Sequence, residues 1–385
     1  SVIFIDRDGT INEEVDHLSD PSQFKLLPGV GSAIRRINES DFRSCVITNQ
    51  PVIARGECSF SELRTIHNKM DTLLGNEGAY IDQLYFCPHH PDRGFAGERP
   101  ELKIACDCRK PRTGMIDNAD KDLNTCRQTS WLIGDTTVDI ETARSAGINS
   151  ILVETGYAGQ DQRSWADPDF CFPDLFHSVT FVMDVYPHLL EYADSLTAAV
   201  TSGSIVLLGG LSRSGKTHLS SAVRLALAAR GQKAVVLSLD RWLHSAANRA
   251  EGVLGRYDLT SVQALLAQLN KRKETMNIQL PGYNKIKREH VENVASVNVR
   301  PDDVVIIEGT VALALTLPDY TDVHRFYLAI PEEKRQQRLL REYRLRGCTE
   351  QEAMDIYQQR QVDEAPVIEA LAVGATRLLP VPTLK

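Results

Sequence analysis

Short apolar runs alternate with longer amphipathic segments along most of the chain. Helical spacing of apolar residues fills Phe60–Leu74, which follows Ser59 as a candidate N-cap. The first half holds four apolar runs with the length and composition of buried strands, at Val2–Ile5, Ser44–Thr48, Trp131–Gly134 and Ser150–Val153. Strands that alternate with helices favour an α/β fold built on a doubly wound parallel sheet.

The same pattern starts again in the second half. Three further strands are predicted there, at Ser204–Leu208, Ala234–Leu237 and Val304–Ile307. The intervening region contains an Asp-Pro-Asp turn at 167–169 and a helical stretch at 181–199, which we interpret as the end of one domain and a linker helix. We therefore expect two α/β domains, residues 1–165 and 203–385, joined by a linker at 166–202.

Length and charge agree with two domains of different character. A chain of 385 residues is long for a single core. Residues 1–200 carry a net charge of −13 and residues 201–385 one of +5, together the −8 of the chain. The basic second half suits an anionic, phosphorylated ligand. Eight cysteines without a leader-like start indicate reduced thiols and a cytoplasmic setting, and no apolar run of 18 residues predicts a membrane span.

Two carboxylates follow the first predicted strand, in Asp6-Arg7-Asp8-Gly9-Thr10. The carboxyl ends of parallel strands are where doubly wound sheets bind ligands. Two aspartates at this spacing can share Mg²⁺ and divide the work of phosphoryl transfer, one attacking phosphorus and the other protonating the leaving oxygen. The competing interpretation is a plain Asx turn after a strand.

Three later elements favour the chemical interpretation. Thr48 and Asn49 end the second strand and can donate hydrogen bonds to a phosphoryl oxygen. Arg109 and Lys110 supply fixed positive charge. Asp135 ends the third strand and adds a carboxylate for metal, with Asp139 four residues later.

In this order the motifs resemble the haloacid dehalogenase superfamily of phosphatases, over residues 1–165. The resemblance implies a nucleophile at Asp6 and a general acid/base at Asp8. It implies phosphate binding by Thr48 and Lys110. It further implies Mg²⁺ held by Asp6, Asp135 and the Asp8 backbone carbonyl, with Asp139 in support.

Three thiols and an imidazole have the spacing of a metal site. Cys87, His89, Cys106 and Cys108 form a Cys₃His set, which is a tetrahedral zinc pattern. The segment between them is too polar to fold alone, so zinc would hold it. His90 is the second choice for the nitrogen ligand, and unrelated buried thiols are the competing interpretation.

The combined pattern Cys-Pro-His-His-Pro…Cys-x-Cys-Arg-Lys-Pro resembles the branch with heptose 1,7-bisphosphate and histidinol-phosphate phosphatases. In that branch the zinc is structural and its loop shapes the substrate pocket. The resemblance implies that Arg55 and Arg109 contact the substrate. Pro51-Val52 departs from the small pair usual at that place.

The second half carries a complete P-loop motif. It follows a predicted strand and precedes a helical pattern, as the motif requires. Its backbone N–H groups face the phosphates, Lys216 reaches the β- and γ-phosphates, and Thr217 binds Mg²⁺. The motif comprises Gly210, Leu211, Ser212, Arg213, Ser214, Gly215, Lys216 and Thr217.

Downstream residues indicate a kinase. Asp240 follows the next strand, placed to take a proton from an acceptor hydroxyl, and Glu308 is a Walker-B-like acid for Mg²⁺. A helix dense in arginine either closes over ATP as a lid or is a solvated surface. Its arginines are Arg335, Arg338, Arg341, Arg344 and Arg346.

These features resemble the uridine kinase and phosphoribulokinase family of P-loop NTPases, over residues 203–350, which implies ATP as co-substrate. Tyr283 is followed by Asn284 where nucleoside kinases carry Asp. Lys285, Lys287 and Arg288 follow, and they predict an acceptor that is already phosphorylated, unless they are ordinary surface charge.

The whole sequence thus predicts a bifunctional phosphatase–kinase for small phosphorylated metabolites, with sugar phosphates in heptose or related metabolism favoured. The alternative is a polynucleotide 5′-kinase/3′-phosphatase, which the net charge and the lack of a basic–aromatic patch count against. A degenerate fusion that only binds nucleotides or partners is the third hypothesis. No membrane partner is expected, and the sequence does not indicate an oligomeric state.

Overall fold

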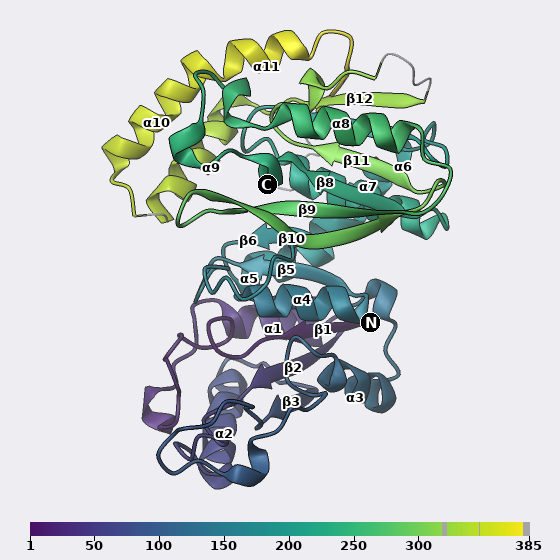
Figure 1. The fold of residues 1–385 in the computed structure, drawn as a ribbon. Helices are drawn as coiled ribbons and strands as arrows, with labels where there is room; N and C mark the ends of the chain where they lie inside the picture. Colours follow the sequence, from purple (N-terminus) through teal and green to yellow (C-terminus); the bar gives the residue numbers. More distant parts are fainter. Residues whose placement is uncertain (318–321, 346, 380–385) are drawn as a thin grey trace. The chain divides into compact units, whose positions relative to one another are not determined.

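The computed structural model describes residues 1–317, 322–345 and 347–379, which divide into two compact units at Asp184/Val185. Each unit is built on its own parallel sheet with helices around it (Figure 1). Both units therefore have the α/β doubly wound class that the alternation of strands and helices predicts. None of the helices in the described ranges has the length and apolar character needed to cross a membrane.

The first unit contains a six-stranded sheet in the order β3-β2-β1-β4-β5-β6. All neighbouring pairs are parallel. The strands are β1 Val2–Ile5, β2 Arg43–Asn49, β3 Gln83–Cys87, β4 Trp131–Gly134, β5 Asn149–Val153 and β6 Phe170–Phe172. The four predicted strands of this half are present. The pattern did not reveal β3 and β6, because β3 is only half-buried and β6 is three residues long.

Helices pack on this sheet through alternate strand positions. Val2 and Phe4 share a buried cluster with Met115 and Ile116 of α3 and Ala143 of α4. The helices of the unit are α1 Val30–Asn38, α2 Phe60–Asn76, α3 Gly114–Leu123, α4 Thr137–Ala146 and α5 Leu175–Thr180. The predicted cap of α2 is confirmed: Ser59 and Glu62 form a reciprocal capping box that satisfies two N–H groups at the start of the helix.

The second unit has a five-stranded parallel sheet in the order β13-β12-β7-β11-β8. The strands are β7 Ile205–Gly209, β8 Ala234–Ser238, β11 Val304–Glu308, β12 Val323–Leu328 and β13 Thr376–Leu378. An antiparallel hairpin, β9 Met276–Asn284 and β10 Glu289–Val299, is long and separate from that sheet (Figure 1). The helices are α6 Tyr186–Leu196, α7 Lys216–Ala229, α8 Leu259–Asn270, α9 Glu332–Leu345, α10 Glu350–Asp363 and α11 Ala365–Leu371.

Different elements pack on the two faces of this sheet. Ile205 and Leu207 belong to a core shared with α8 and the hairpin. Val206 and Leu208 instead lie with Leu219 and other apolar side chains of α6 and α7. Because successive strand residues point to opposite faces, a strand covered on both sides reads as the continuous apolar run seen at 205–208.

Candidate functional site

Parallel pairing brings the chemistry-bearing residues of the first unit to one edge of the sheet. Asp6 follows β1, Thr48 and Asn49 end β2, and Asp135 follows β4; these three strands are neighbours. The order of the strands reverses between β1 and β4, which is where doubly wound sheets bind ligands. The sequence is therefore folded so that four predicted site residues converge at a topological switch point.

Lys110 lies between two carboxylates of this site. Its Nζ is 2.8 Å from an oxygen of Asp6 and 2.6 Å from an oxygen of Asp139. Nζ also donates to the backbone carbonyl of Ile47 at 3.1 Å. All three side chains are buried, so the ammonium group offsets charge that water cannot reach.

Asp6, Asp135 and Asp139 each place a carboxylate oxygen within 4.8 Å of the others. Burial and the neighbouring Asp139 raise the pKa of Asp6 to about 7, against the lowering effect of Lys110. Burial, Asp6 and Asp139 raise the pKa of Asp135 to about 9. Carboxylates crowded in this way repel one another, and a divalent cation would relieve the repulsion.

Asp135 shows where a cation fits. Its Oδ2 accepts a hydrogen bond from the Tyr157 N–H at 2.7 Å, whereas Oδ1 is buried and has no hydrogen-bond partner among the described residues. Two glycines make room for this carboxylate, because a Cβ at Gly9 or Gly156 would lie 2.3 or 2.2 Å from Oδ2. A buried acceptor left open beside two more carboxylates has the chemistry of a Mg²⁺ ligand. Gly156 carries no motif signal, so the sequence did not indicate it.

Asp139 is already satisfied within the protein. One oxygen binds Lys110, and the other accepts from the N–H and the hydroxyl of Thr136 at 3.2 and 2.5 Å in a capping box at the start of α4. These bonds suit the supporting role predicted for it, because few lone pairs remain for a metal ion.

Asp8 is separate from the three-carboxylate cluster. It accepts two hydrogen bonds at 2.7 Å from Arg7, one at 3.0 Å from Asn12 and one at 2.9 Å from Gln50. Although burial raises the pKa of Asp8, the charge and hydrogen bonds of Arg7 and the amides outweigh it and lower that pKa below its usual value. Arg7 itself is completely buried. The pattern singled out Asp8 but not the donors that hold it.

The two residues after Ile47 contact the site differently. Thr48 is buried, and its hydroxyl accepts a hydrogen bond from Gln50 at 2.8 Å. Asn49 forms two hydrogen bonds with the backbone of Lys110. Thr48 therefore lies beside Gln50, one of the residues that donate to Asp8. Asn49 holds the backbone of Lys110 in place.

The predicted zinc ligands converge in the insert between β3 and α3. The three Sγ atoms are 3.2 to 3.5 Å apart, and His89 Nδ1 lies 3.7 Å from Cys87 and 3.4 Å from Cys108. Around a tetrahedral Zn²⁺ with Zn–S distances of ~2.3 Å, the sulfur atoms are about 3.8 Å apart. The observed separations are slightly shorter, so small movements of these side chains would fit them to such an ion. His90 lies elsewhere: its Nδ1 accepts from the Asp92 N–H, and its Nε2 is 3.4 Å from Arg55.

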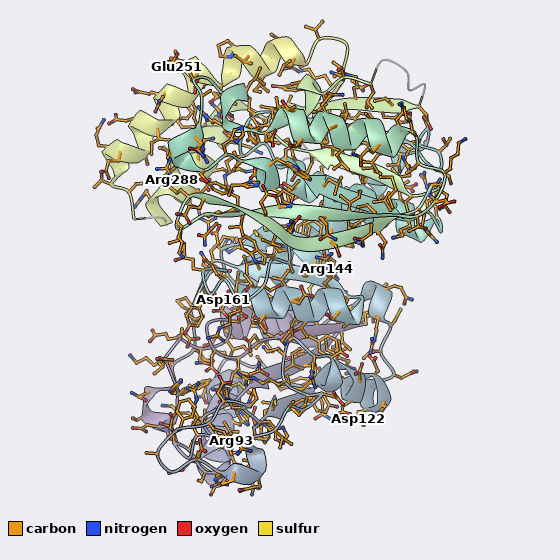
Figure 2. All side chains as sticks on the ribbon, viewed as in Figure 1. Arg93, Asp122, Arg144, Asp161, Glu251 and Arg288 are labelled. Carbon is orange, nitrogen blue, oxygen red and sulfur yellow. The ribbon has the colours of Figure 1, made fainter. Side chains whose placement is uncertain are left out.

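Arg55 and Arg109 lie against the same insert. Arg55 stacks over Phe95 at 4.6 Å, and Lys103 lies over that ring at 4.5 Å. Arg109 donates to the His89 carbonyl at 3.2 Å. Figure 2 marks the insert by its exposed Arg93. Phe95 thus contacts both Arg55 and Lys103, although a lone phenylalanine in a polar loop gave no sequence signal.

The P-loop of the second unit lies between β7 and α7. Gly210 and Gly215 have φ values of 150° and 102°, which suit glycine. A Cβ at Gly210 would lie 2.6 Å from the Leu328 carbonyl oxygen. Lys216 is buried, and its Nζ donates to the Leu211 carbonyl at 2.8 Å and lies 3.5 Å from Ser214.

Glu308 contacts this loop, and Asp240 acts on its lysine electrostatically. Thr217 Oγ1 lies 3.4 Å from Glu308, the last residue of β11. Asp240 is exposed just after β8. Burial lowers the pKa of Lys216, while Glu308, Glu364 and Asp240 act in the opposite direction. Glu364 was not predicted, because it lies at a helix junction without a motif.

The arginine-dense helix is α9. Arg338 donates to the Arg213 carbonyl at 3.3 Å, and Arg213 pairs with Glu342 on the same helix. Arg335 is fully buried, and Arg341 is exposed. Arg338 and Glu342, one turn apart on α9, thus contact the P-loop. Arg346, also predicted to bind ATP, lies outside the described residues.

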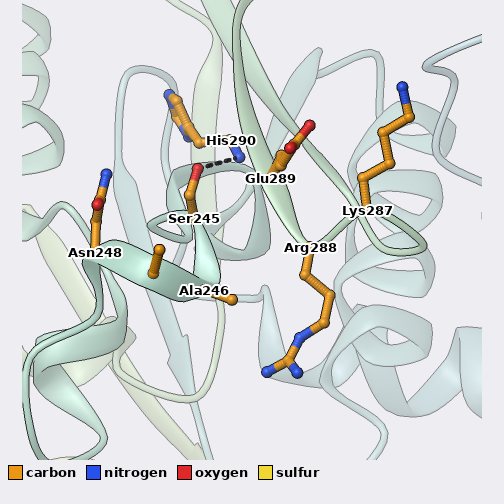
Figure 3. Close-up of a pocket in the computed structure, with 8 residues that line it drawn as sticks. Ser245, Ala246, Asn248, Lys287, Arg288, Glu289 and His290 are labelled. Atoms are coloured by element: carbon orange, nitrogen blue, oxygen red, sulfur yellow. Dashed lines mark hydrogen bonds between the residues drawn. The ribbon is translucent and has the colours of Figure 1, made fainter.

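The predicted acceptor residues lie at the tip of the β9–β10 hairpin. A pocket of about 390 Å³ is lined there by Ser245, Asn248, Lys287, Arg288 and His290, among others. Lys287 and Arg288 point in different directions in Figure 3. Tyr283 is partly covered by Arg249, which donates to its hydroxyl at 2.6 Å, and Lys285 is exposed at the same turn.

Sequence comparison finds relatives of the first unit. The HAD-hydrolase-like family model matches residues 107–177. The D-glycero-β-D-manno-heptose-1,7-bisphosphate 7-phosphatase of Yersinia pestis is 37% identical over 155 residues, 40% of this chain and 80% of that protein.

Among solved structures, the D,D-heptose 1,7-bisphosphate phosphatase of B. bronchiseptica, complexed with magnesium and phosphate, is 29% identical. That match covers 47% of this chain and 97% of the other, with a TM-score of 0.41. A protein described as a possible uridine kinase from Bacillus stearothermophilus is 20% identical, covering 51% of this chain and 100% of the other, with a TM-score of 0.33.

The fold and the carboxylate site define the first unit as a phosphatase-class domain. Through this unit the chain belongs to the haloacid dehalogenase-like phosphatases, in the branch that holds the heptose-1,7-bisphosphate phosphatases. The similarity to the Yersinia pestis phosphatase covers 40% of the chain.

Proposed function

We propose that the chain is a bifunctional enzyme in which the first unit hydrolyses a phosphate ester of a sugar bisphosphate and the second phosphorylates a hydroxyl group with ATP. The observation that carries the proposal is the buried cluster of Asp6, Asp135 and Asp139, in which Lys110 pairs with Asp6 and Asp139. It lies in a domain 37% identical to an enzyme that acts on heptose 1,7-bisphosphate.

In the first unit, Asp6 is the nucleophile. One of its oxygens attacks phosphorus, the bond from phosphorus to the sugar oxygen breaks, and Asp8 protonates the departing oxygen. Water then attacks phosphorus, the bond between phosphorus and the Asp6 oxygen breaks, and inorganic phosphate is released while Asp8 takes the proton from that water. The Arg7, Asn12 and Gln50 donors favour the carboxylate form of Asp8 that this second step needs. The first step uses the protonated form, so Asp8 has to carry its proton when the substrate is bound.

The remaining residues of the first site bind charge. Lys110 and Thr48 would bind the phosphoryl group, and Arg55 and Arg109 would contact the rest of the substrate beside the insert. Asp6, Asp135 and the Asp8 carbonyl would hold Mg²⁺, which when bound offsets the negative charge of nucleophile and phosphate. Cys87, His89, Cys106 and Cys108 would hold a structural Zn²⁺.

In the second unit, Asp240 accepts the proton of the acceptor hydroxyl. Lys216 and the P-loop amides of Gly210, Ser212, Arg213, Ser214 and Gly215 bind the phosphates, and Thr217 and Glu308 would hold Mg²⁺. Arg338 and Arg341 of α9 support the nucleotide, and the hairpin with Tyr283, Lys285 and Arg288 receives the acceptor. The cations of the hairpin favour an acceptor that already bears a phosphate.

The two activities can be assayed separately on the intact chain. Phosphate release is measured with Mg²⁺ from heptose 1,7-bisphosphate, hexose bisphosphates and a 3′-phosphorylated oligonucleotide. ADP formation is measured with ATP and sugars, sugar monophosphates, nucleosides and a 5′-hydroxyl oligonucleotide. We expect sugar bisphosphates to be hydrolysed and a sugar phosphate to be phosphorylated. A preference for the oligonucleotides in both assays would replace the proposal with nucleic-acid end repair.

A further inference from the structure

A carboxylate of the second unit binds a P-loop amide. The Ser212 N–H donates to Glu364 Oε1 at 2.7 Å, a short distance typical of a charge-assisted hydrogen bond. Glu364 is 152 residues away in the sequence, at the junction of α10 and α11, and only 1% of it is exposed. Its charge also acts on Lys216, the lysine of the P-loop.

P-loop N–H groups point inward to bind phosphate oxygens. Here the Ser212 N–H donates instead to a carboxylate oxygen of Glu364, which is negatively charged like a phosphate oxygen. The Ser212 N–H cannot donate to the carboxylate and to a phosphate oxygen at the same time. A buried carboxylate beside the loop would also repel a nucleotide phosphate. We propose that Glu364 is an intramolecular competitor for a nucleotide phosphate, so the α10–α11 junction must move away from the P-loop when ATP binds. This inference rests on the proposed nucleotide binding.

Other contacts keep Glu364 in this position. Its Oε2 pairs with Arg360 at 3.2 Å, and Arg360 donates to the Tyr343 hydroxyl at 2.8 Å. The preceding residue, Asp363, pairs with Arg256. Arg360 lies on α10 and Tyr343 on α9, so the carboxylate is connected to the helix whose Arg338 contacts the P-loop. Displacement of Glu364 would leave Arg360 without this partner and near the vacated anion position.

The decisive variant is Glu364→Gln, which keeps the shape of the side chain and removes its charge. The dissociation constant of Mg·ATP is measured by calorimetry on the full chain. We expect binding to be about tenfold tighter in Glu364→Gln than in the wild type. Glu369→Gln is the matched control, because Glu369 lies on α11 and contacts Tyr327 and Arg377 rather than the P-loop. This variant should leave the dissociation constant of Mg·ATP unchanged.

Equal or weaker binding by Glu364→Gln, with the wild type binding ATP, would overturn the competitor role and leave the proposed kinase intact. Absence of binding in both folded proteins would overturn the nucleotide site and the competitor together. A second measurement needs no variant. Hydrogen exchange of backbone amides in residues 360–371 of the wild type should speed up on addition of Mg·ATP, and unchanged or slower exchange there would contradict the proposal.

Discussion

Asn49 and Lys110 exchange two hydrogen bonds, one from the Lys110 N–H to Asn49 Oδ1 at 2.9 Å and one from Asn49 Nδ2 to the Lys110 carbonyl at 3.1 Å. A side-chain amide thus fixes the backbone of the residue whose ammonium group lies between Asp6 and Asp139. The position of the lysine therefore depends on a residue at the end of β2 rather than on its own loop.

Asn49→Ala should lower phosphatase kcat by about 10- to 100-fold, because a small displacement of a charge in the site is costly. Asn38→Ala is the control, since Asn38 makes the same pair of bonds with the backbone of Tyr80, at 2.9 and 3.0 Å. Each variant should cost roughly 1–2 kcal/mol of unfolding free energy. A similar loss of kcat in both variants would show that the amide acts on stability alone.

The proposed zinc site predicts a difference between two cysteines. Cys108→Ser should release the metal and make the insert at residues 88–105 sensitive to proteolysis, because a polar segment held by a metal loses its order without it. Metal content is measured by mass spectrometry, and cleavage is mapped on the full chain. Cys126→Ser, at an exposed thiol outside the cluster, should change neither. Full zinc occupancy in Cys108→Ser would contradict the assignment.

Stability should fall in mild acid because of a half-buried histidine, His67. Burial, and then the neighbouring Arg7, lower the pKa of His67 from 6.5 to about 4. The unfolded chain therefore binds a proton that the folded chain does not. The stability that His67 contributes is complete above about pH 6.5 and is lost as the pH falls from there toward 4, by on the order of 2 kcal/mol.

Urea unfolding at pH 7 and pH 5 measures this effect. His67→Gln should show a smaller difference in unfolding free energy between the two pH values than the wild type does. His188→Gln is the control, because the His188 side chain is 64% exposed. An unchanged pH difference in His67→Gln would rule out His67 as the source of the acid sensitivity.

Helices and strands were predictable where residues close together in the sequence determine them. The buried strands at 2–5 and 205–208 were predictable, because a strand covered on both faces is apolar throughout. Strand β3 was not, since its first four residues are only half-buried, and β9 was not, since its buried positions are irregular. The cap of α2 was predictable from Ser59, because a capping box lies within four residues.

The candidate sites divide in the same way. Asp6 and Asp135 follow neighbouring strands of the first sheet, so their meeting at one edge of that sheet follows from parallel pairing. The P-loop follows β7 of the second sheet and was predictable from its motif. Phe95 and Glu364 act through contacts between residues that are far apart in the sequence, and no local pattern indicates such contacts. Glu364 contacts Ser212 across 152 residues of sequence, so that contact is a product of tertiary packing.

Two matched variants test the central claim, that the two halves of the chain carry separate phosphoryl-transfer sites. Asp6→Asn and Lys216→Ala are given Mg²⁺, a sugar bisphosphate, ATP and an acceptor, and released phosphate and ADP are measured separately. Asp6→Asn should lose phosphate release by at least about 10³-fold and keep acceptor-dependent ADP formation, and Lys216→Ala should do the reverse. Loss of both signals in both variants, or of neither in either, would contradict the division of chemistry between the two units.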